Sequence, residues 1–233
     1  MSIRTQRADY PSADGKASIP AYVAEPEAPG RHPAVLILRG VAGPEDGYTE
    51  ITERIAGWGY VALLHGWKIR GDDPPDAIVQ PDLAGALAYL RSLEAADPAR
   101  LAVFGFCRGG VHALMAVAAH AQIRLAVIFH GFAFRPEKAQ PGVEPYDLAL
   151  KVAVPTLILH GIEDERAPVE GMRRLEDRAR KAGRPIEFRY YERARHGFAV
   201  RTHPGFDAPT AQASFAEARK FIDAHFQRDS QPR

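Results

Sequence analysis

The only cysteine of the chain stands in a pattern that is typical of a nucleophile. The apolar run 101–104 leads into it, and Cys107 lies two residues after Gly105 and two residues before Gly109. This Gly-x-Cys-x-Gly spacing is the cysteine form of the nucleophile elbow, a sharp turn that joins a strand to a helix. The glycines are needed because the chain on the two sides of such a strained turn lies too close together for side chains. The spacing therefore predicts that Cys107 is a nucleophile.

An acid and a base follow Cys107 in the order that this chemistry requires. A thiol is a useful nucleophile only as the thiolate, and its free pKa is about 8.5. His196 can take the thiol proton and return it to a leaving group, and Asp164 can orient the imidazole and stabilise its charged form. Nucleophile, acid and histidine is the chain order of the α/β-hydrolase triad. We expect the backbone N–H groups of Val41 and Arg108 to form the oxyanion hole.

The elements that must position these residues alternate between strands and helices. Apolar runs predict strands at 17–24, 34–38, 60–64, 101–104, 125–129, 156–159 and 186–191. Helical patterns occupy 48–58, 111–120, 168–182 and 208–226, and a further helix begins at 76 or at 80 and runs to about 93. This order predicts an α/β fold. We expect an α/β-hydrolase-type, mostly parallel twisted sheet of about seven or eight strands, with helices on both faces and no large cap. The sequence predicts one domain over 1–233 with a polar tail at 227–233, a turn at Asp97-Pro98 and a long connection over 132–152. The site residues of such a sheet follow the carboxyl ends of its strands.

Composition limits the classes of partner and compartment. The 233 residues carry 30 Lys and Arg against 29 Asp and Glu, so the net charge is +1 and no broad basic surface for nucleic acid is expected. A lone cysteine cannot form an internal disulfide, which favours a reducing, cytoplasmic setting. We expect no signal peptide, and no apolar run approaches the roughly 18 residues that span a membrane.

Histidines at other strand ends raise the question of a metal. His65, His130 and His160 each follow a predicted strand and precede a glycine. The simpler interpretation is that they are hydrogen-bonded structural residues, because the elbow already accounts for the same edge of the sheet. We therefore expect neither a metal nor a cofactor.

Three segments resemble one family, and similarity covers nearly the whole chain. They are Gly105-Phe-Cys-Arg-Gly-Gly, His160-Gly-Ile-Glu-Asp-Glu-Arg-Ala-Pro and Tyr191-Glu-Arg-Ala-Arg-His-Gly-Phe. In these the chain is similar to the dienelactone hydrolase family of α/β-hydrolases. The resemblance implies a Cys-His-Asp triad at Cys107, His196 and Asp164. It also implies hydrolysis of a small carboxylic ester or lactone through an acyl-thioester.

The chain departs from this family at the positions that set activation and specificity. The resemblance implies a glutamate after the first core strand, where Gly40 stands here and Glu45 is a nearby carboxylate. It also implies arginines that hold a substrate carboxylate. Val200 occupies the place of one, with Arg201 next to it, and Arg70 is the nearest candidate for the other. We therefore expect this chain to share the family's triad but not its dienelactone substrate.

Several side chains remain candidates for the substrate pocket, and several functions remain open. The pocket candidates are Arg39, Trp67, Arg70, Phe132, Phe198 and Arg201. One alternative function is a thioesterase or peptidase-like acyl hydrolase on the same triad. Another is a non-catalytic or redox-sensing scaffold. The sequence identifies neither the natural substrate nor the oligomeric state.

Overall fold

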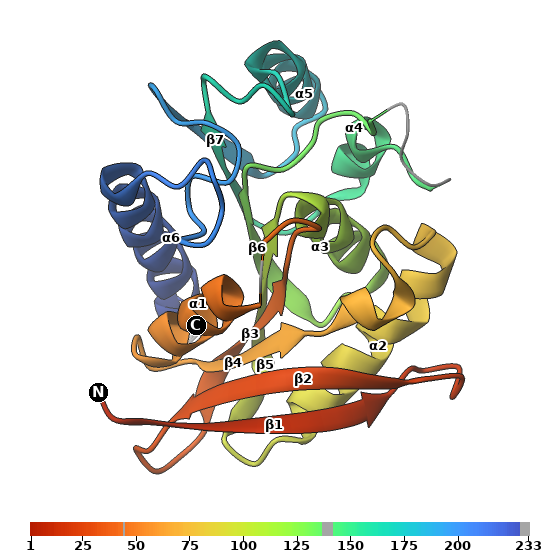
Figure 1. The fold of residues 1–233 in the computed structure, drawn as a ribbon, viewed down its shortest axis with the longest axis vertical. Helices are drawn as coiled ribbons and strands as arrows, with labels where there is room; N and C mark the ends of the chain where they lie inside the picture. The colour runs from red at the N-terminus through yellow and green to blue at the C-terminus, as the bar shows by residue number, and fades with distance from the viewer. Residues whose placement is uncertain (44, 137–141, 229–233) are drawn as a thin grey trace.

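A twisted sheet of eight strands runs through the computed structural model, which describes residues 1–43, 45–136 and 142–228 (Figure 1). The strands are β1 (Ile3–Pro11), β2 (Ser18–Pro26), β3 (His32–Leu38), β4 (Val61–His65), β5 (Ala96–Phe106), β6 (Ile123–Phe129), β7 (Thr156–Gly161) and β8 (Ile186–Tyr191). Their order is β1-β2-β4-β3-β5-β6-β7-β8. Strands β3 to β8 pair in parallel, and β1 and β2 are antiparallel. The predicted mostly parallel sheet of about seven or eight strands is confirmed, with eight strands.

Helices cover both faces of this sheet, as predicted. They are α1 (Asp46–Ala56), α2 (Asp76–Ser92), α3 (Arg108–Ala119), the short α4 (Pro145–Leu148), α5 (Val169–Lys181) and α6 (Ala208–Arg228), with 3-10 turns η1 (Trp67–Arg70) and η2 (Ala149–Lys151). Apolar residues of α2, α3 and α5 belong to the core on one face. Those of α1 and α6 belong to the core on the other face. In the described ranges, the connections at the carboxyl edge are loops and short helical turns, and no large cap covers the sheet.

Strand β3 shows why continuous apolar runs form the centre of the sheet. Its side chains alternate between the two cores: Ala34, Leu36 and Leu38 pack on one face, and Val35 and Ile37 pack on the other. All five are fully buried. Each large aliphatic side chain buried in this way contributes about 1.5–3 kcal/mol, so the strand must be apolar on both faces.

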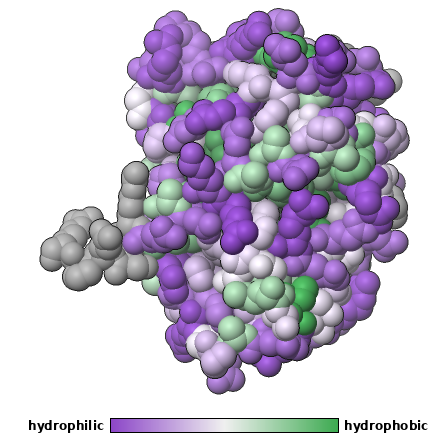
Figure 2. Space-filling model, turned by 90° about the vertical axis from the view of Figure 1, so that its left-hand side faces the viewer, coloured by the Kyte–Doolittle hydropathy of each residue, from purple (hydrophilic) through white to green (hydrophobic). Residues whose placement is uncertain are grey.

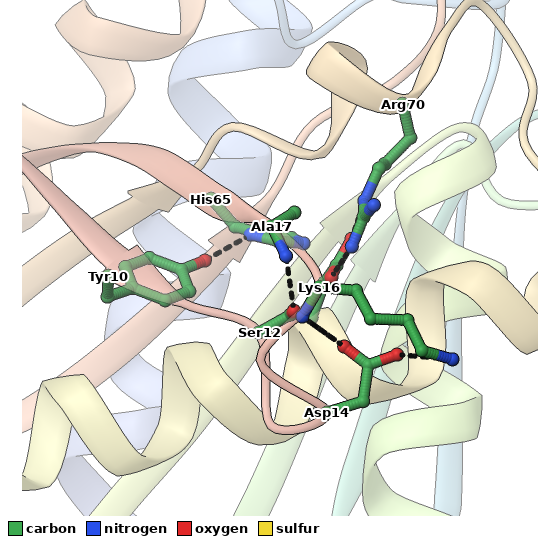
Figure 3. A network of polar contacts seen from close by, with 8 residues as sticks. Tyr10, Ser12, Asp14, Lys16, Ala17, His65 and Arg70 are labelled. Atoms are coloured by element: carbon green, nitrogen blue, oxygen red, sulfur yellow. Dashed lines mark hydrogen bonds and ion pairs between the residues drawn. The ribbon is translucent and has the colours of Figure 1, made fainter.

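The N-terminal strand β1 was missed in the sequence because most of its side chains face solvent. Tyr10 is its one buried residue. The Tyr10 hydroxyl is hydrogen-bonded to Nδ1 of His65 at the end of β4 (Figure 3). The turn to β2 is closed by Ser12 Oγ, which donates to Asp14 at 2.7 Å, and by the backbone N–H of Lys16, which donates to the same carboxylate oxygen at 3.1 Å (Figure 3). These polar contacts, rather than an apolar pattern, fix the hairpin.

The expected turn at Asp97-Pro98 was wrong, because both residues lie inside β5. The pairing with β3 jumps from His32↔Ala96 to Ala34↔Leu101, which is an irregularity in the ladder. The extra residues of β5, including Pro98, lie within this irregularity and have no paired residue on β3. The proline therefore need not donate a hydrogen bond to the neighbouring strand.

Two further expectations concern the connections and the C-terminus. The connection 132–152 includes the short α4 and η2, while 137–141 lie outside the described residues. Of the predicted polar tail 227–233, the backbone of 227 and 228 continues α6, and 229–233 lie outside the described residues.

The surface is mixed in polarity. On the face drawn in Figure 2, hydrophilic residues alternate with small hydrophobic areas. None of the described helices combines the length and the apolar character needed to cross a bilayer.

Candidate active site

Cys107 lies at the junction of β5 and α3 in a strained backbone conformation. Its φ is 55° and its ψ is −119°, a positive φ that non-glycine residues rarely adopt. A Cβ at Gly105 would collide with the backbone carbonyl of Gly109, so the glycine is required sterically. Such strain costs about 1–3 kcal/mol and is typical of functional turns. The side chain of Cys107 sits at the N-terminus of α3, where the helix dipole favours negative charge.

The loop after β3 lies directly against the elbow. A Cβ built on Gly40 would be 2.9 Å from Cβ of Cys107, so the two backbones approach closely there. Val41 follows Gly40, and its carbonyl accepts a hydrogen bond from Lys68 Nζ at 2.9 Å. The two segments that carry the expected oxyanion donors, at Val41 and Arg108, therefore both lie next to Cys107. The assignment of those N–H groups stays a prediction.

Asp164 and His196 meet as the sequence predicts, from the loops after β7 and β8. His196 Nδ1–H donates to Asp164 Oδ2 at 2.8 Å. The other oxygen, Oδ1, accepts the backbone N–H groups of Arg166 at 2.9 Å and Ala167 at 2.8 Å. Both side chains are buried, Asp164 at 3% and His196 at 5% exposure. The carboxylate is therefore fixed by three hydrogen bonds and holds the imidazole in one orientation.

The environment of His196 favours its protonated form. Burial lowers its pKa, but the hydrogen bond to Asp164 and the interaction with the Cys107 sulfur outweigh burial and raise the pKa to about 9. Its Nε2 is buried with no hydrogen-bond partner among the described protein atoms. The ring lies 5.5 Å from that of Phe132 and 5.0 Å from that of His130. The imidazole can thus hold a proton at neutral pH.

The three arginines expected to hold a substrate carboxylate are engaged elsewhere. Arg39 is buried and donates to Gly43 O at 2.6 Å and to Gly40 O, so it braces the loop after β3. Arg70 forms a two-point ion pair with Asp82, at 2.7 and 2.9 Å. Arg201 pairs with Glu50 on the surface. Each of the three side chains has a partner within the protein, and a role in holding a substrate carboxylate stays a prediction.

The carboxylate of Glu45 also lies away from the sulfur. It accepts a hydrogen bond from Arg7 Nη1 at 2.9 Å, and both side chains are exposed. Glu45 therefore does not fill the space beside Gly40.

The aromatic candidates divide into core and pocket. Trp67 and Phe198 are completely buried, and the Trp67 Nε1–H donates to Arg39 O at 3.0 Å. Both side chains pack in the interior, which corrects their assignment as pocket lining. Phe132 is half-buried and lines a hollow of about 570 Å³ beside the site.

Arg166 is a site residue that sequence reasoning missed. It lines both the hollow beside Phe132 and a second hollow of about 280 Å³ that includes Ala42, His196 and His203. Its side chain is exposed, and its charge faces His203. Its position could have identified it, because Arg166 lies two residues after Asp164, in a segment that already contained a predicted site residue.

Arg108 was predicted for its backbone only, yet its side chain organises the edge of the site. It is buried and bonds Asp73 at 2.8 Å and Asp76 at 2.5 Å. Asp76 also accepts Arg135 Nη1 at 3.0 Å and the N–H of Val143 at 2.7 Å. This network ties two loops to the start of α3. No local pattern marks it, because its members are far apart in sequence.

Comparisons with known proteins agree with this architecture. The family model of the dienelactone hydrolase family matches residues 19–76 and 67–226. A protein of Methylorubrum extorquens named putative carboxymethylenebutenolidase is 30% identical over 219 residues, covering 87% of this chain and 75% of the relative. A Bradyrhizobium protein named probable 2-oxo-3-(5-oxofuran-2-ylidene)propanoate lactonase is 25% identical, covering 88% of this chain and 89% of the relative.

A solved structure shares the whole fold. The crystal structure of a putative dienelactone hydrolase from Klebsiella pneumoniae superposes with a TM-score of 0.84 at 24% identity, covering 96% of this chain and 99% of that one. The likeness supports the α/β-hydrolase arrangement of sheet and helices. With the family match over most of its length, the chain belongs to the dienelactone hydrolase family and is a hydrolase of that type.

Proposed function

We propose that this protein hydrolyses a small carboxylic ester or lactone, with Cys107 as nucleophile, His196 as base and acid, and Asp164 as the group that orients His196. The observation that carries the proposal is the 2.8 Å contact of His196 Nδ1 with Asp164 Oδ2. Nε2 of the same ring has no hydrogen-bond partner among the described residues, and the ring interacts with the Cys107 sulfur. The names of the relatives, which include a lactonase, support the substrate class.

The reaction follows from these positions. His196 takes the thiol proton, and the Cys107 sulfur attacks the acyl carbon, so that the carbonyl π pair moves to oxygen. Backbone N–H groups of Val41 and Arg108 stabilise this oxyanion. As the tetrahedral intermediate collapses, the C–O bond breaks and His196 gives its proton to the departing alkoxide. In a lactone that alkoxide stays attached to the acyl group.

Hydrolysis of the acyl-thioester completes the cycle. His196, now neutral, removes a proton from water, and the resulting hydroxide attacks the thioester carbon. The C–S bond breaks, the carboxylic acid leaves, and the sulfur departs as a thiolate. His196 then returns to this thiolate the proton that it took from water, which restores the starting state. Asp164 keeps the imidazole in the tautomer that presents Nε2 to each proton transfer.

The test is acylation of Cys107 by an activated ester. We expect mass spectrometry of protein mixed with p-nitrophenyl acetate to show one acetyl group on the peptide that contains Cys107. We expect Cys107→Ala and His196→Ala each to lose at least about 10³-fold in kcat/KM, because triad members act as a unit. His120→Ala is the matched control, because His120 caps the far end of α3. Wild-type turnover in both triad variants would refute the mechanism.

A substrate panel separates the alternatives that share the triad. Lactones, p-nitrophenyl esters, acyl-thioesters and dipeptide amides would be compared by kcat/KM. We expect the lactones and esters to rank first. Preference for thioesters or amides would assign a different acyl substrate. No acylation by any of them would leave a binding or redox-sensing scaffold.

A further inference from the structure

Tyr48 is held rigidly next to the elbow. It lies in the first turns of α1 and is 1% exposed. Its ring packs edge-to-face on Phe106, the residue before Cys107, with centroids 5.9 Å apart. The guanidinium carbon of Arg39 lies 4.8 Å from the centre of the same ring. Contacts with both neighbours fix the direction in which the phenol points.

The Tyr48 hydroxyl faces the cysteine across the space left by Gly40. A Cβ on Gly40 would lie 2.9 Å from Tyr48 Oη and also 2.9 Å from Cβ of Cys107. The hydroxyl therefore lies within about 6 Å of Cβ of Cys107. Because Gly40 has no side chain, nothing from that residue screens the two groups from each other.

The hydrogen bonds of the phenol leave its proton available. The Gly40 N–H donates to Tyr48 Oη at 3.1 Å, which occupies an acceptor position of the oxygen. The carbonyl that can accept the phenolic proton, Ala42 O, is 3.5 Å away, beyond the usual range for a hydroxyl donor. A negatively charged sulfur on the Cys107 side is a better acceptor than that distant carbonyl.

The charge state of the phenol suits a donor rather than a base. Burial, and after it the negative charge of the Cys107 thiolate, raises the pKa of Tyr48 to about 12. The hydroxyl therefore keeps its proton across the working range of a cysteine hydrolase. It can donate a hydrogen bond but cannot accept the thiol proton, which leaves proton transfer to His196.

We infer that the Tyr48 hydroxyl donates a hydrogen bond to the thiolate of Cys107 and stabilises this form of the nucleophile. The inference rests on the proposed function, because it assigns a partner to the nucleophile. No bond to sulfur is made or broken by Tyr48, and no proton leaves it. Hydrogen bonding to the charged form of a group favours that form, so the thiol ionises more readily with the phenol present.

The test is the alkylation rate of Cys107 by iodoacetamide as a function of pH. Tyr48→Phe keeps the ring that packs on Phe106 and removes only the hydroxyl. We expect alkylation at pH 7 to slow about tenfold and its midpoint to move to higher pH, because a hydrogen bond to a charged group is lost. The limiting rate at high pH should match wild type, and kcat/KM at pH 7 should fall by a similar factor.

Two further variants keep the test decisive. Tyr60→Phe removes another buried hydroxyl, which donates to Asp223. Tyr60 lies just before the amino end of β4, whereas Cys107 follows the carboxyl end of β5, so this variant should leave the profile unchanged. Gly40→Ala adds a methyl group that contacts both Tyr48 Oη and Cβ of Cys107, and it should shift the profile in the same direction as Tyr48→Phe. If Tyr48→Phe does not fold, the Gly40→Ala profile decides.

An unchanged alkylation profile in a folded Tyr48→Phe protein, or in Gly40→Ala where that variant decides, would overturn the inference. This outcome is separate from failure of the proposed function. Alkylation reports on the thiol without any turnover, whereas retention of hydrolysis by Cys107→Ala would refute the nucleophile itself.

Discussion

His196 and His112 are both buried imidazoles, but they face opposite environments. His196 is 5% exposed and donates to the carboxylate of Asp164. His112, in α3, is fully buried, and neither of its ring nitrogens has a hydrogen-bond partner among the described protein atoms. Its ring lies edge-to-face against Trp67, with centroids 5.2 Å apart. One histidine is held by charge, and the other by packing.

The two environments shift the pKa values of these histidines in opposite directions. Burial, followed by the positive charge of Arg108, lowers the pKa of His112 well below its ordinary value. Burial acts in the same direction on His196, but Asp164 and the Cys107 sulfur reverse it and raise the pKa to about 9. A carboxylate and a sulfur therefore distinguish the histidine that can shuttle a proton from the one that cannot.

Removing the carboxylate should produce the largest effect and make His196 resemble His112. In Asp164→Asn, the amide oxygen can still accept the N–H groups of Arg166 and Ala167, which turns the amide NH₂ toward His196. Nδ1 must then accept, so the ring proton moves to Nε2 and the base is blocked. We expect kcat/KM for p-nitrophenyl acetate to fall about 10³–10⁴-fold.

The same variant has a second readout and a control. NMR titration should show the His196 pKa falling from its raised value, because burial then acts without the carboxylate. Asp177→Asn, which loses an exposed carboxylate paired with Lys181, should leave both measurements unchanged. If Asp164→Asn kept activity within a few-fold of wild type, proton transfer by His196 would not depend on the negative charge of Asp164.

The parts of this site that could be predicted from sequence are local. The strand run before Cys107, the glycines around it, and an acid and a histidine after later strands depend only on spacing. Once the order of strands is known to be parallel, their carboxyl ends must meet at one edge. Cys107, Asp164 and His196 gather there without any knowledge of long-range contacts.

The parts that the sequence did not show depend on partners far away in the chain. Arg201 forms an ion pair with Glu50, which precedes it by 151 residues. No sequence pattern around Arg201 therefore shows that its guanidinium has this partner. The ring of Tyr48 lies against Phe106, which directly precedes Cys107 and is 58 positions away from Tyr48 in the chain. Helical periodicity marks Tyr48 simply as apolar. Strand β1 has almost no buried face and gives no signal at all.

The pH dependence of stability offers a smaller test of the same contrast. The pKa of His196 is raised above the unfolded value of about 6.5, so its stabilising contribution is fully present below that pH and is lost as the pH rises through about 9. We expect the melting temperature of wild type to exceed that of His196→Gln by more at pH 6 than at pH 10. A difference that grows with pH would contradict a raised pKa.

Replacing His112 should have the smallest effect and should change stability only in acid. Leucine is close to histidine in volume, and removing a buried polar group that lacks partners is nearly neutral or stabilising, so His112→Leu should keep kcat/KM within about twofold. The depressed pKa means that only the unfolded chain binds a proton at His112 below about pH 6.5, which destabilises wild type there. The melting temperature of the variant, relative to wild type, should therefore rise as the pH falls from 8 to 5. A loss of activity as large as that of Asp164→Asn would instead place His112 in the catalytic machinery and break the contrast with His196.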